Sequence, residues 1–339
     1  MESIAPRSDI EQKLIEIWTQ LLGHTAFGVH DSFFHVGGDS FSAVRLLPQL
    51  NSRFGCDISL AELVRNPTVS GIAAILGGSV TEATVLVPLN PQGRRPPLFC
   101  IHPVSGNVSR FFELARTLGE EQPVYAFQSA GLSDGLLAQD SIEQMAATYV
   151  EKIVRLRPRG PYRLLGYSMG GIVAYECARR LYERTGEHPF VAMVDTDLRD
   201  LSAIDPWDLL VRTVLKANVK GTALRGLERD AAVSTLHGLC VGHGVFDADF
   251  PLARLGDIYD TVLANIMAMR TYTPTAYSGG ITLFCCGQTS DLGWSPHAGS
   301  ITNHVLGADH YKAMEREGSS RIAAVLSQLP PGDGEEPCR

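Results

Sequence analysis

The sequence predicts a small all-α bundle followed by an α/β domain, in which helices cover both faces of a mostly parallel sheet. Residues 8–78 carry amphipathic helical repeats, whereas residues 93–330 alternate short apolar strands with helices. Within the second domain, residues from about 198 to 272 are mainly helical and poor in strands, which predicts a helical lid inserted between late strands. Residues 79–92 are the expected linker, because their first part is a flexible Gly/Ser/Thr stretch.

Composition limits the classes of function. The chain has 339 residues, of which 45% are hydrophobic, and a net charge of -8, which argues against a nucleic-acid or anionic-membrane surface. It shows no signal-peptide pattern and no apolar run near the ~18 residues of a membrane span. Seven scattered cysteines are typical of reduced thiols. We therefore expect a cytoplasmic monomer that binds neither nucleic acid nor membranes.

Three helices are predicted in the first domain. Ser8–Glu11 is a capping box that starts the first helix. Its apolar face repeats at helical spacing: Ile10, Leu14, Ile17, Trp18 and Leu21. The second helix should start near Ser40 and bury Val44, Leu47 and Leu50. Asn66-Pro67 is expected to cap a short third helix that ends at Gly77-Gly78.

Strands and helices alternate along the second domain. Three predicted helices lie among the apolar runs: one capped by Ser141, one through 169–185 and a final one near 311–328. The expected strands are LFCI (98–101), PVYAF (123–127), YRLLGY (162–167), FVAMV (190–194), ITLFCC (281–286) and HVL (304–306). This order predicts βαβ units and hence a mostly parallel sheet.

Two stretches match G-x-S-x-G, the nucleophile-elbow pattern of α/β-hydrolases. In GYSMG (166–170) a strand ends at Ser168 and a helix begins directly after it, so helix-terminal N–H groups can face a developing oxyanion. In GLSDG (131–135), Ser133 lies in a loop and the next helix starts only near Ser141. Context therefore favours Ser168 as the nucleophile and Ser133 as a surface turn.

An acid and a base should follow the nucleophile in that order. Asp195 comes directly after the strand that follows Ser168, Asp291 comes one strand later, and Asp197 lies further from its strand end. We favour Asp195 and keep the other two as alternatives. For the base we favour His310, which lies in a loop after the last strand and before the closing helix. His304 belongs to a strand, and His297 lies in a Gly/Ser/Pro loop.

The oxyanion hole needs two convergent backbone N–H groups. We expect one from Met169, directly after the nucleophile, and one from Val104 in the loop HPVSGN (102–107). His102 is expected to be structural. His237, Cys240 and His243 have ligand-like spacing, but a structural zinc site wants four ligands and no obvious fourth is near, so no metal is expected.

Ser40 lies in the stretch VGGDSFSAV (36–44) and admits two explanations. Asp39 could cap the helix, with Ser40 tolerated in its first turn. Alternatively, the serine carries a covalent group. The stretch alone leaves both possibilities open.

Motifs along both domains resemble known families. The residues DSFFHVGGDSFSAVRLLPQLNSRFG (31–55) and NPTVSGIAAIL (66–76), in a small helical bundle, resemble the peptidyl carrier domains of nonribosomal peptide synthetases. The resemblance places a covalent 4′-phosphopantetheine on Ser40. LFCIHPVSGN, GYSMGG and GADH, with the early Asp195, resemble the type I thioesterase domains that end such assembly lines, and this raises Asp195 over Asp291. Pro48, inside the second helix, departs from a good helix pattern and is expected to kink it.

The resemblance implies a releasing enzyme. Upstream synthetase modules, with condensation and adenylation domains, would deliver an acyl or peptidyl chain to a Ser40 arm that a phosphopantetheinyl transferase installs. Ser168 would accept the chain, with His310 as base and Asp195 as its orienting acid, and water or a group of the chain itself would release it. The alternatives are an editing or general esterase with an unmodified docking module, and a binding protein with an inert elbow.

Overall fold

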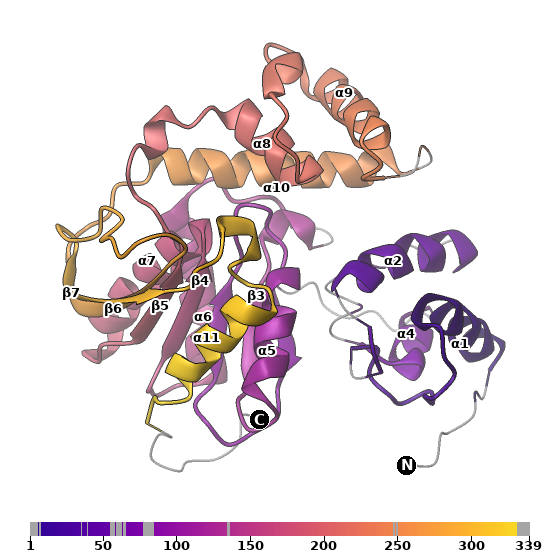
Figure 1. The fold of residues 1–339 in the computed structure, drawn as a ribbon, viewed down its shortest axis with the longest axis horizontal. Coiled ribbons are helices and arrows are strands. Elements are labelled where there is room, and N and C mark those ends of the chain that lie inside the picture. The colour runs from indigo at the N-terminus through magenta and orange to yellow at the C-terminus, as the bar shows by residue number, and fades with distance from the viewer. Residues whose placement is uncertain are drawn as a thin grey trace. The chain divides into compact units, whose positions relative to one another are not determined.

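The computed structural model describes residues 6, 8–34, 36–38, 40–54, 58, 63, 66–76, 85–133, 136–246, 248 and 250–330. The chain divides into two compact units, Met1–Pro88 and Leu89–Arg339. Figure 1 labels the helices and strands of both units.

Helices α1 (Asp9–Leu22), α2 (Ser40–Phe54) and α4 (Val69–Leu76) form the first unit. Ser8 caps α1 as predicted, since its side chain accepts the Glu11 N–H at 3.2 Å. Leu50 is fully buried and Leu47 is partly buried, whereas the side chains of Val44 and Pro48 lie outside the described residues. Among the described residues, the core of this unit gathers apolar side chains from α1, α2, α4 and the segments between them: Leu14, Ile17, Trp18, Phe27, Val29, Phe33, Ala43, Leu46, Leu50, Ile58, Leu63, Val69 and Ile72.

The predicted cap at Asn66-Pro67 is wrong by two residues. Helix α4 starts at Val69, and the Thr68 hydroxyl accepts the Gly71 N–H at 2.9 Å. Thr68 forms an isolated antiparallel bridge with Ser32, and the Pro67 carbonyl accepts the Phe33 N–H at 2.6 Å. These long-range bonds keep the backbone extended through Thr68, so the helix begins later than the local pattern indicates.

A seven-stranded sheet, in the order β1-β3-β2-β4-β5-β6-β7, forms the centre of the second unit. The pairs that join β2 to β3 and β4, and then β4 through β7 in turn, are all parallel. The strands are β1 (Leu86–Asn90), β2 (Leu98–Ile101), β3 (Val124–Phe127), β4 (Arg163–Tyr167), β5 (Phe190–Val194), β6 (Tyr277–Cys285) and β7 (Ala298–Val305). The mostly parallel sheet predicted from the sequence is thus confirmed.

Two predicted boundaries need correction. Residues 86–90 of the expected linker form β1, which lies at the edge of the sheet, where Pro88 is tolerated because an edge strand need not donate every N–H. The final helix, α11 (Arg316–Leu326), begins later than 311. A short 3₁₀ turn over His310–Lys312, capped by the Asp309 side chain, comes first.

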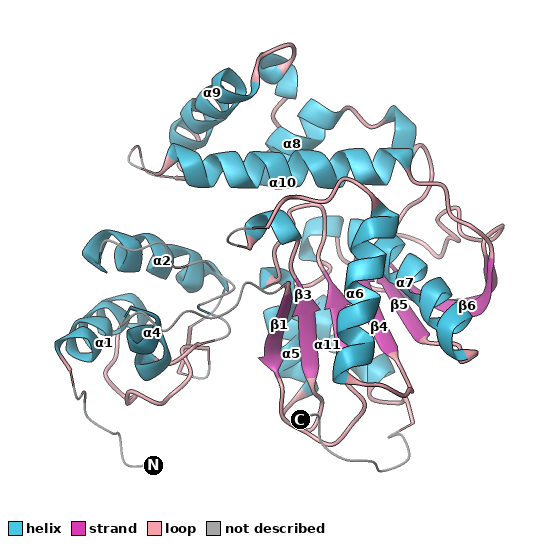
Figure 2. Ribbon diagram, turned by 180° about the vertical axis from the view of Figure 1, so that it is seen from behind, coloured by secondary structure: helices cyan, strands magenta, loops and turns pink. Residues whose placement is uncertain are grey.

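Helices cover both faces of the sheet. Helices α5 (Phe112–Leu118) and α11 contact each other on one face, and α6 (Ile142–Leu156) and α7 (Met169–Thr185) contact each other on the other, as the two opposite views in Figures 1 and 2 show. Ser141 caps α6 as predicted, accepting the Gln144 N–H at 3.4 Å. This arrangement agrees with the α/β class predicted from the alternation of strands and helices.

Between β5 and β6 the chain is helical, with α8 (Pro206–Leu215), α9 (Arg229–Gly242) and the long α10 (Leu252–Thr271). These helices pack on one another through a core of their own that includes Leu210, Leu236 and Ile266, each fully buried. Figure 2 shows α10 crossing one end of the sheet, with α8 and α9 on its outer side. The inserted segment therefore has its own core and meets the rest of the unit through α10.

Candidate active site

Ser168 stands at the turn where β4 ends and α7 begins, as the elbow pattern predicts. Its backbone is in the left-handed half of φ/ψ space, at φ 56° and ψ -126°, which is strained for a serine. Three hydrogen bonds hold this conformation. The Ser168 N–H donates to the Val194 carbonyl at 2.8 Å, and the Ser168 carbonyl accepts from the Thr196 hydroxyl at 2.9 Å and the Gly171 N–H at 3.0 Å.

The glycines around Ser168 are required by close backbone approach. A Cβ on Gly166 would lie 2.1 Å from the Gly170 carbonyl oxygen, and one on Gly170 would lie 2.1 Å from the Ile101 carbonyl oxygen. Strand, elbow and helix therefore pack backbone against backbone, and the first turn of α7 adjoins the end of β2.

Asp195 directly follows β5. Its carboxylate contacts His310, which lies 115 residues further along the chain. Its Oδ2 lies 2.7 Å from His310 Nδ1, and its Oδ1 accepts the Cys286 N–H at 3.2 Å. Its backbone is also left-handed, at φ 47°, and its N–H donates to the Phe284 carbonyl at 2.9 Å. Burial acts to raise the pKa of Asp195, but hydrogen bonds from His310 and Cys286 outweigh burial and hold this pKa below its usual value.

His310 is fixed to the elbow as well as to the acid. The Tyr167 hydroxyl donates to the His310 carbonyl at 2.6 Å, and the two rings lie 5.2 Å apart. An ionised carboxylate only accepts hydrogen bonds, so Nδ1 carries the proton and Nε2 is the basic nitrogen. Ser168, Asp195 and His310 thus come from three loops at the carboxyl edge of the sheet, where parallel α/β folds hold their active sites.

The two alternative acids have other partners. Asp197 is exposed and forms an ion pair of 2.6 Å with Arg199. Asp291 accepts the Gly293 N–H at 3.2 Å within its own turn, and a hydrogen bond from Ser295 lowers its pKa. Both therefore behave as turn aspartates.

Other candidates also have local partners. Ser133 was expected in a surface turn, but this is wrong, because Ser133 is buried and accepts a hydrogen bond from Gln128 at 3.3 Å. The ring of His304 on β7 stacks on the ring of Phe284 on β6, and the His297 carbonyl accepts the Tyr277 N–H. His237 and Cys240 lie on α9, and among the described residues no group of three or more His, Cys, Asp or Glu side chains could hold a metal ion.

The loop after β2 carries Val104, the predicted second oxyanion donor. Gly106, with φ 79°, closes a turn by donating its N–H to the Pro103 carbonyl at 2.9 Å. Asn265, fully buried on α10, donates to the Val104 carbonyl at 3.0 Å. Gly170, in the first turn of α7 next to Met169, packs against the backbone of Ile101 and His102, so the start of α7 adjoins the start of this loop, which α10 contacts through Asn265.

The sequence reasoning missed three of these contacting residues. Tyr167 had a usable signal, because it directly precedes the nucleophile. Cys286 also had one, since it ends the apolar run ITLFCC, one strand after Asp195. Asn265 had none, because nothing in the sequence pairs α10 with the loop after β2.

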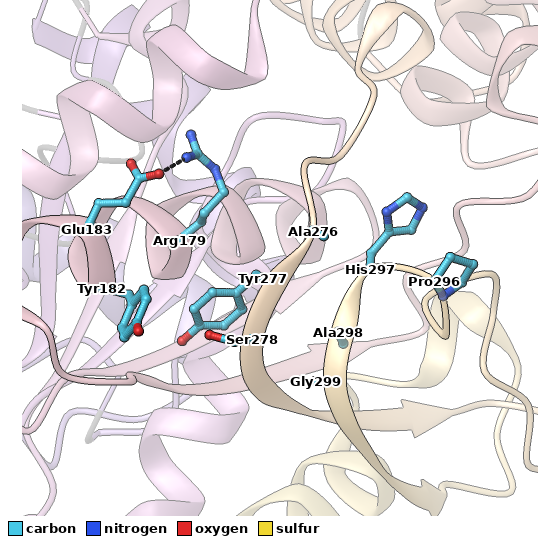
Figure 3. Close-up of a pocket in the computed structure, with 10 residues that line it drawn as sticks. All are labelled: Arg179, Tyr182, Glu183, Ala276, Tyr277, Ser278, Pro296, His297, Ala298 and Gly299. Carbon is cyan, nitrogen blue, oxygen red and sulfur yellow. Dashed lines mark hydrogen bonds and ion pairs between the residues drawn. The ribbon is translucent and has the colours of Figure 1, made fainter.

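A pocket opens at the opposite end of β6 and β7 from His310. Figure 3 shows it between the end of α7 and the first residues of both strands, with Arg179 and Glu183 paired at its rim. Tyr182 and Tyr277 also line it. Because these are the amino ends of the strands, the pocket is separate from the candidate active site.

Ser40 is the first residue of α2 in the first unit. In the described part of the preceding loop, the Gly38 N–H donates to the Phe33 carbonyl at 2.8 Å, and a Cβ on Gly38 would lie 2.4 Å from the Phe33 ring. The Val36 carbonyl bonds the His24 ring at 2.8 Å. A serine at a helix N-terminus after a constrained loop fits a phosphodiester, because helix-terminal N–H groups favour an anion.

Two protein families match this chain. The phosphopantetheine attachment site family matches residues 12–76, and the thioesterase domain family matches residues 96–236. Both matches agree with the two resemblances seen in the motifs.

Among the similar proteins, malpibaldin synthetase of Mortierella alpina is 42% identical over 337 residues, which is 95% of this chain and 6% of the synthetase. A dimodular nonribosomal peptide synthase of Bacillus subtilis is 29% identical over 95% of this chain and 14% of its own length. The chain thus spans a small part of these relatives.

Solved structures agree at the level of the fold. A four-domain nonribosomal peptide synthetase matches 98% of this chain and 27% of its own chain, with a TM-score of 0.68 and 27% identity. The NocB thioesterase domain, in covalent complex with a fluorophosphonate nocardicin G analog, matches 72% of this chain and 98% of its own, with a TM-score of 0.52 and 23% identity.

No helix in the described ranges is long and apolar enough to cross a membrane.

Proposed function

We propose that the chain releases an acyl or peptidyl group from a Ser40-linked thioester through an ester on Ser168. The proposal is supported by the match to the phosphopantetheine attachment site family followed by the match to the thioesterase domain family. One observation supports this most directly. His310 and Asp195, 115 residues apart, meet at 2.7 Å beside the strained elbow that holds Ser168. A nucleophile that is followed along the chain by an orienting acid and then by a base is the order found in α/β-hydrolases, and these three roles together support acyl transfer.

Ser40 is the residue that would hold the arm, at the start of α2. A 4′-phosphopantetheine bound there supplies a flexible thiol on which the chain is held as a thioester. The residues around Ser40 hold the loop backbone, and the helix N-terminus favours the phosphodiester charge.

In the first half of the reaction, His310 Nε2 removes the proton from Ser168 Oγ while the oxygen attacks the thioester carbonyl. Met169 and Val104 N–H groups stabilise the oxyanion, and loss of one such donor typically lowers kcat by roughly 10²–10³-fold. Asp195 holds the imidazole in the Nδ1–H tautomer and stabilises the cation that forms. The C–S bond breaks, His310 returns the proton to the leaving sulfur, and the chain remains as an ester on Ser168.

In the second half, His310 takes a proton from the incoming nucleophile and gives it back to Ser168. Water as nucleophile gives a free acid, whereas an amine or hydroxyl of the chain itself gives a ring. Both outcomes use the same residues. The helices α8–α10, which pack over the loop that carries Val104, are the segment that would exclude water and fold the chain back.

We further propose that residues 8–78 are the carrier domain, that residues 93–330 are the releasing domain and that the segment between them contributes β1 to the sheet. Upstream condensation and adenylation domains would load the arm, after a phosphopantetheinyl transferase has attached it to Ser40. The relatives that this chain matches over 95% of its length are large synthetases, which supports such partners.

The first test is an intact mass after incubation with coenzyme A and a broad-specificity phosphopantetheinyl transferase, with Ser40→Ala as the control. We expect a gain of one phosphopantetheine that the control lacks. No gain on folded protein would leave Ser40 as an ordinary helix-start residue and favour an esterase with an unmodified docking module.

The second test loads Ser40 with an acyl-phosphopantetheine from an acyl-coenzyme A and follows loss of the acyl group by mass. Wild-type protein should release the acid, whereas Ser168→Ala should keep its load. Equal release from both would remove Ser168 from the mechanism. Equal retention on both, together with an inert Ser168 toward a fluorophosphonate probe, would favour a binding protein.

A further inference from the structure

His102 is a fully buried titratable residue for which the reaction above has no use. It directly follows β2 and precedes the loop that carries Val104. Its Nδ1 lies 2.9 Å from the Pro103 carbonyl oxygen, and its Nε2 lies 2.8 Å from the Tyr149 hydroxyl on α6. Both ring nitrogens therefore have partners in the interior.

The partners determine which nitrogen carries the proton. A carbonyl oxygen only accepts, so Nδ1 must donate to Pro103. Burial lowers the pKa of His102 to about 4, against the opposing effect of the Pro103 hydrogen bond, so the ring is neutral near pH 7. In the neutral ring Nε2 is then the acceptor, and the Tyr149 hydroxyl donates to it.

The bond to Pro103 acts on Val104 through the peptide that the two residues share. In a planar trans peptide the C=O and the following N–H point in opposite directions. The Pro103 carbonyl is held by His102 Nδ1 and by the Gly106 N–H, both at 2.9 Å. Two donors on one end of the peptide thus restrict rotation of the Val104 N–H at the other end.

We infer that His102, oriented by Tyr149, is a positioning residue that aims the Val104 N–H at the oxyanion. The inference rests on the proposed function, in which this N–H is an oxyanion donor. His102 touches no reacting atom and acts through the peptide plane alone. Its role is to keep the donor aligned before the substrate arrives, which is what makes oxyanion stabilisation effective.

The surroundings of Tyr149 support a rigid arrangement. Its ring stacks on Phe127 of β3 at 4.2 Å with an interplanar angle of 17°, and both side chains are fully buried. Tyr149 of α6 is therefore fixed in the core of the second unit, and its contact with His102 restricts the movement of the loop that follows His102.

Two matched variants test the inference, because each mimics one ring nitrogen. The amide nitrogen of His102→Asn lies close to Nδ1 and can still donate to Pro103, whereas that of His102→Gln lies close to Nε2. We expect His102→Gln to lower kcat by roughly 10–100-fold with little change in KM, below the loss from removing a donor outright. His102→Asn should recover most of this loss. Tyr149→Phe, which keeps the ring, should lower kcat by a few-fold.

The assay is turnover of an acyl-N-acetylcysteamine thioester by the full chain, with circular dichroism and thermal unfolding to verify folding. The inhibition constant of a trifluoromethyl ketone, which forms an oxyanion on Ser168, provides a second readout. It should rise with His102→Gln in proportion to the fall in kcat, a change that a merely structural role would not produce.

The outcomes separate the inference from the proposed function. Turnover that survives Ser168→Ala would overturn both. Ser168-dependent turnover with wild-type kcat in His102→Gln would overturn the inference alone, as would equal losses in the Asn and Gln variants. If neither variant at 102 folds, an unchanged kcat and inhibition constant in Tyr149→Phe would also overturn it.

Discussion

Acidification should destabilise the second unit through His102. Burial lowers the pKa of this imidazole from 6.5 to about 4 in the folded chain, so the unfolded chain binds the proton more tightly. Stability should therefore fall as the pH drops from about 6.5 to about 4 and be unaffected by this group below that range. Within this range, each unit by which the pH falls lowers the unfolding free energy by about 1.4 kcal/mol. Between pH 7 and pH 5 the loss is about 2 kcal/mol of unfolding free energy.

The assay is urea unfolding at pH 7, 6 and 5, followed by tryptophan fluorescence. A Trp18→Phe background leaves Trp207 and Trp294, both in the second unit, as reporters. The control is His102→Asn in the same background, because asparagine does not titrate. Carboxylates and the other histidines contribute equally to both proteins and cancel in the comparison.

The quantity to compare is the change in unfolding free energy between pH 7 and pH 5. It should be larger in the protein with His102 by about 2 kcal/mol. Equal pH slopes in the two proteins would refute the reasoning, since a buried neutral imidazole with two hydrogen bonds cannot be silent in this range. A larger slope in the asparagine variant would have the wrong sign and refute it equally.

Three further predictions follow from the site. Asp195→Asn should lower kcat by roughly 10⁴-fold through loss of the correct imidazole tautomer, whereas Asp291→Asn should leave the rate of thioester turnover within about two-fold of wild type. Gly171→Ala would place a Cβ 2.1 Å from the Thr196 hydroxyl and should lower the unfolding free energy by about 1–3 kcal/mol. Gly238→Ala, in open space on α9, should raise it by about 0.5–1 kcal/mol. The opposite ranking of the two variants in urea unfolding would contradict the packing. Asn265→Ala should lower the unfolding free energy by about 1–3 kcal/mol, because it leaves the partly buried Val104 carbonyl without this donor, and an unchanged urea midpoint would contradict the contact.

The acid shows how far local sequence reasoning extends. The position of Asp195 directly after β5 favoured it, but Asp197 and Asp291 also follow strands at somewhat greater distance. The family resemblance strengthened the preference for Asp195 that its position had already given. In the structure the difference is physical, because Asp197 is paired with Arg199 and Asp291 bonds its own turn, while Asp195 meets His310.

The starts of the helices also divide into those that local bonds decide and those that long-range contacts decide. Ser8 and Ser141 cap their helices as the sequence predicts, since a capping bond joins residues three apart. The start of α4 was misplaced, because the bridge between Ser32 and Thr68 spans a long loop and overrides the local pattern.

By itself, the sequence determined the two fold classes, the parallel sheet and the elbow at Ser168, because hydrophobic periodicity, capping residues and close-packed glycines act over a few residues. Only the tertiary structure decided which aspartate meets His310, that Tyr167 holds the His310 backbone and that His102 and Asn265 brace the loop after β2 from two sides. These contacts join side chains from elements far apart in the chain. Their geometry depends on how strands and helices pack, and no short stretch of sequence encodes it.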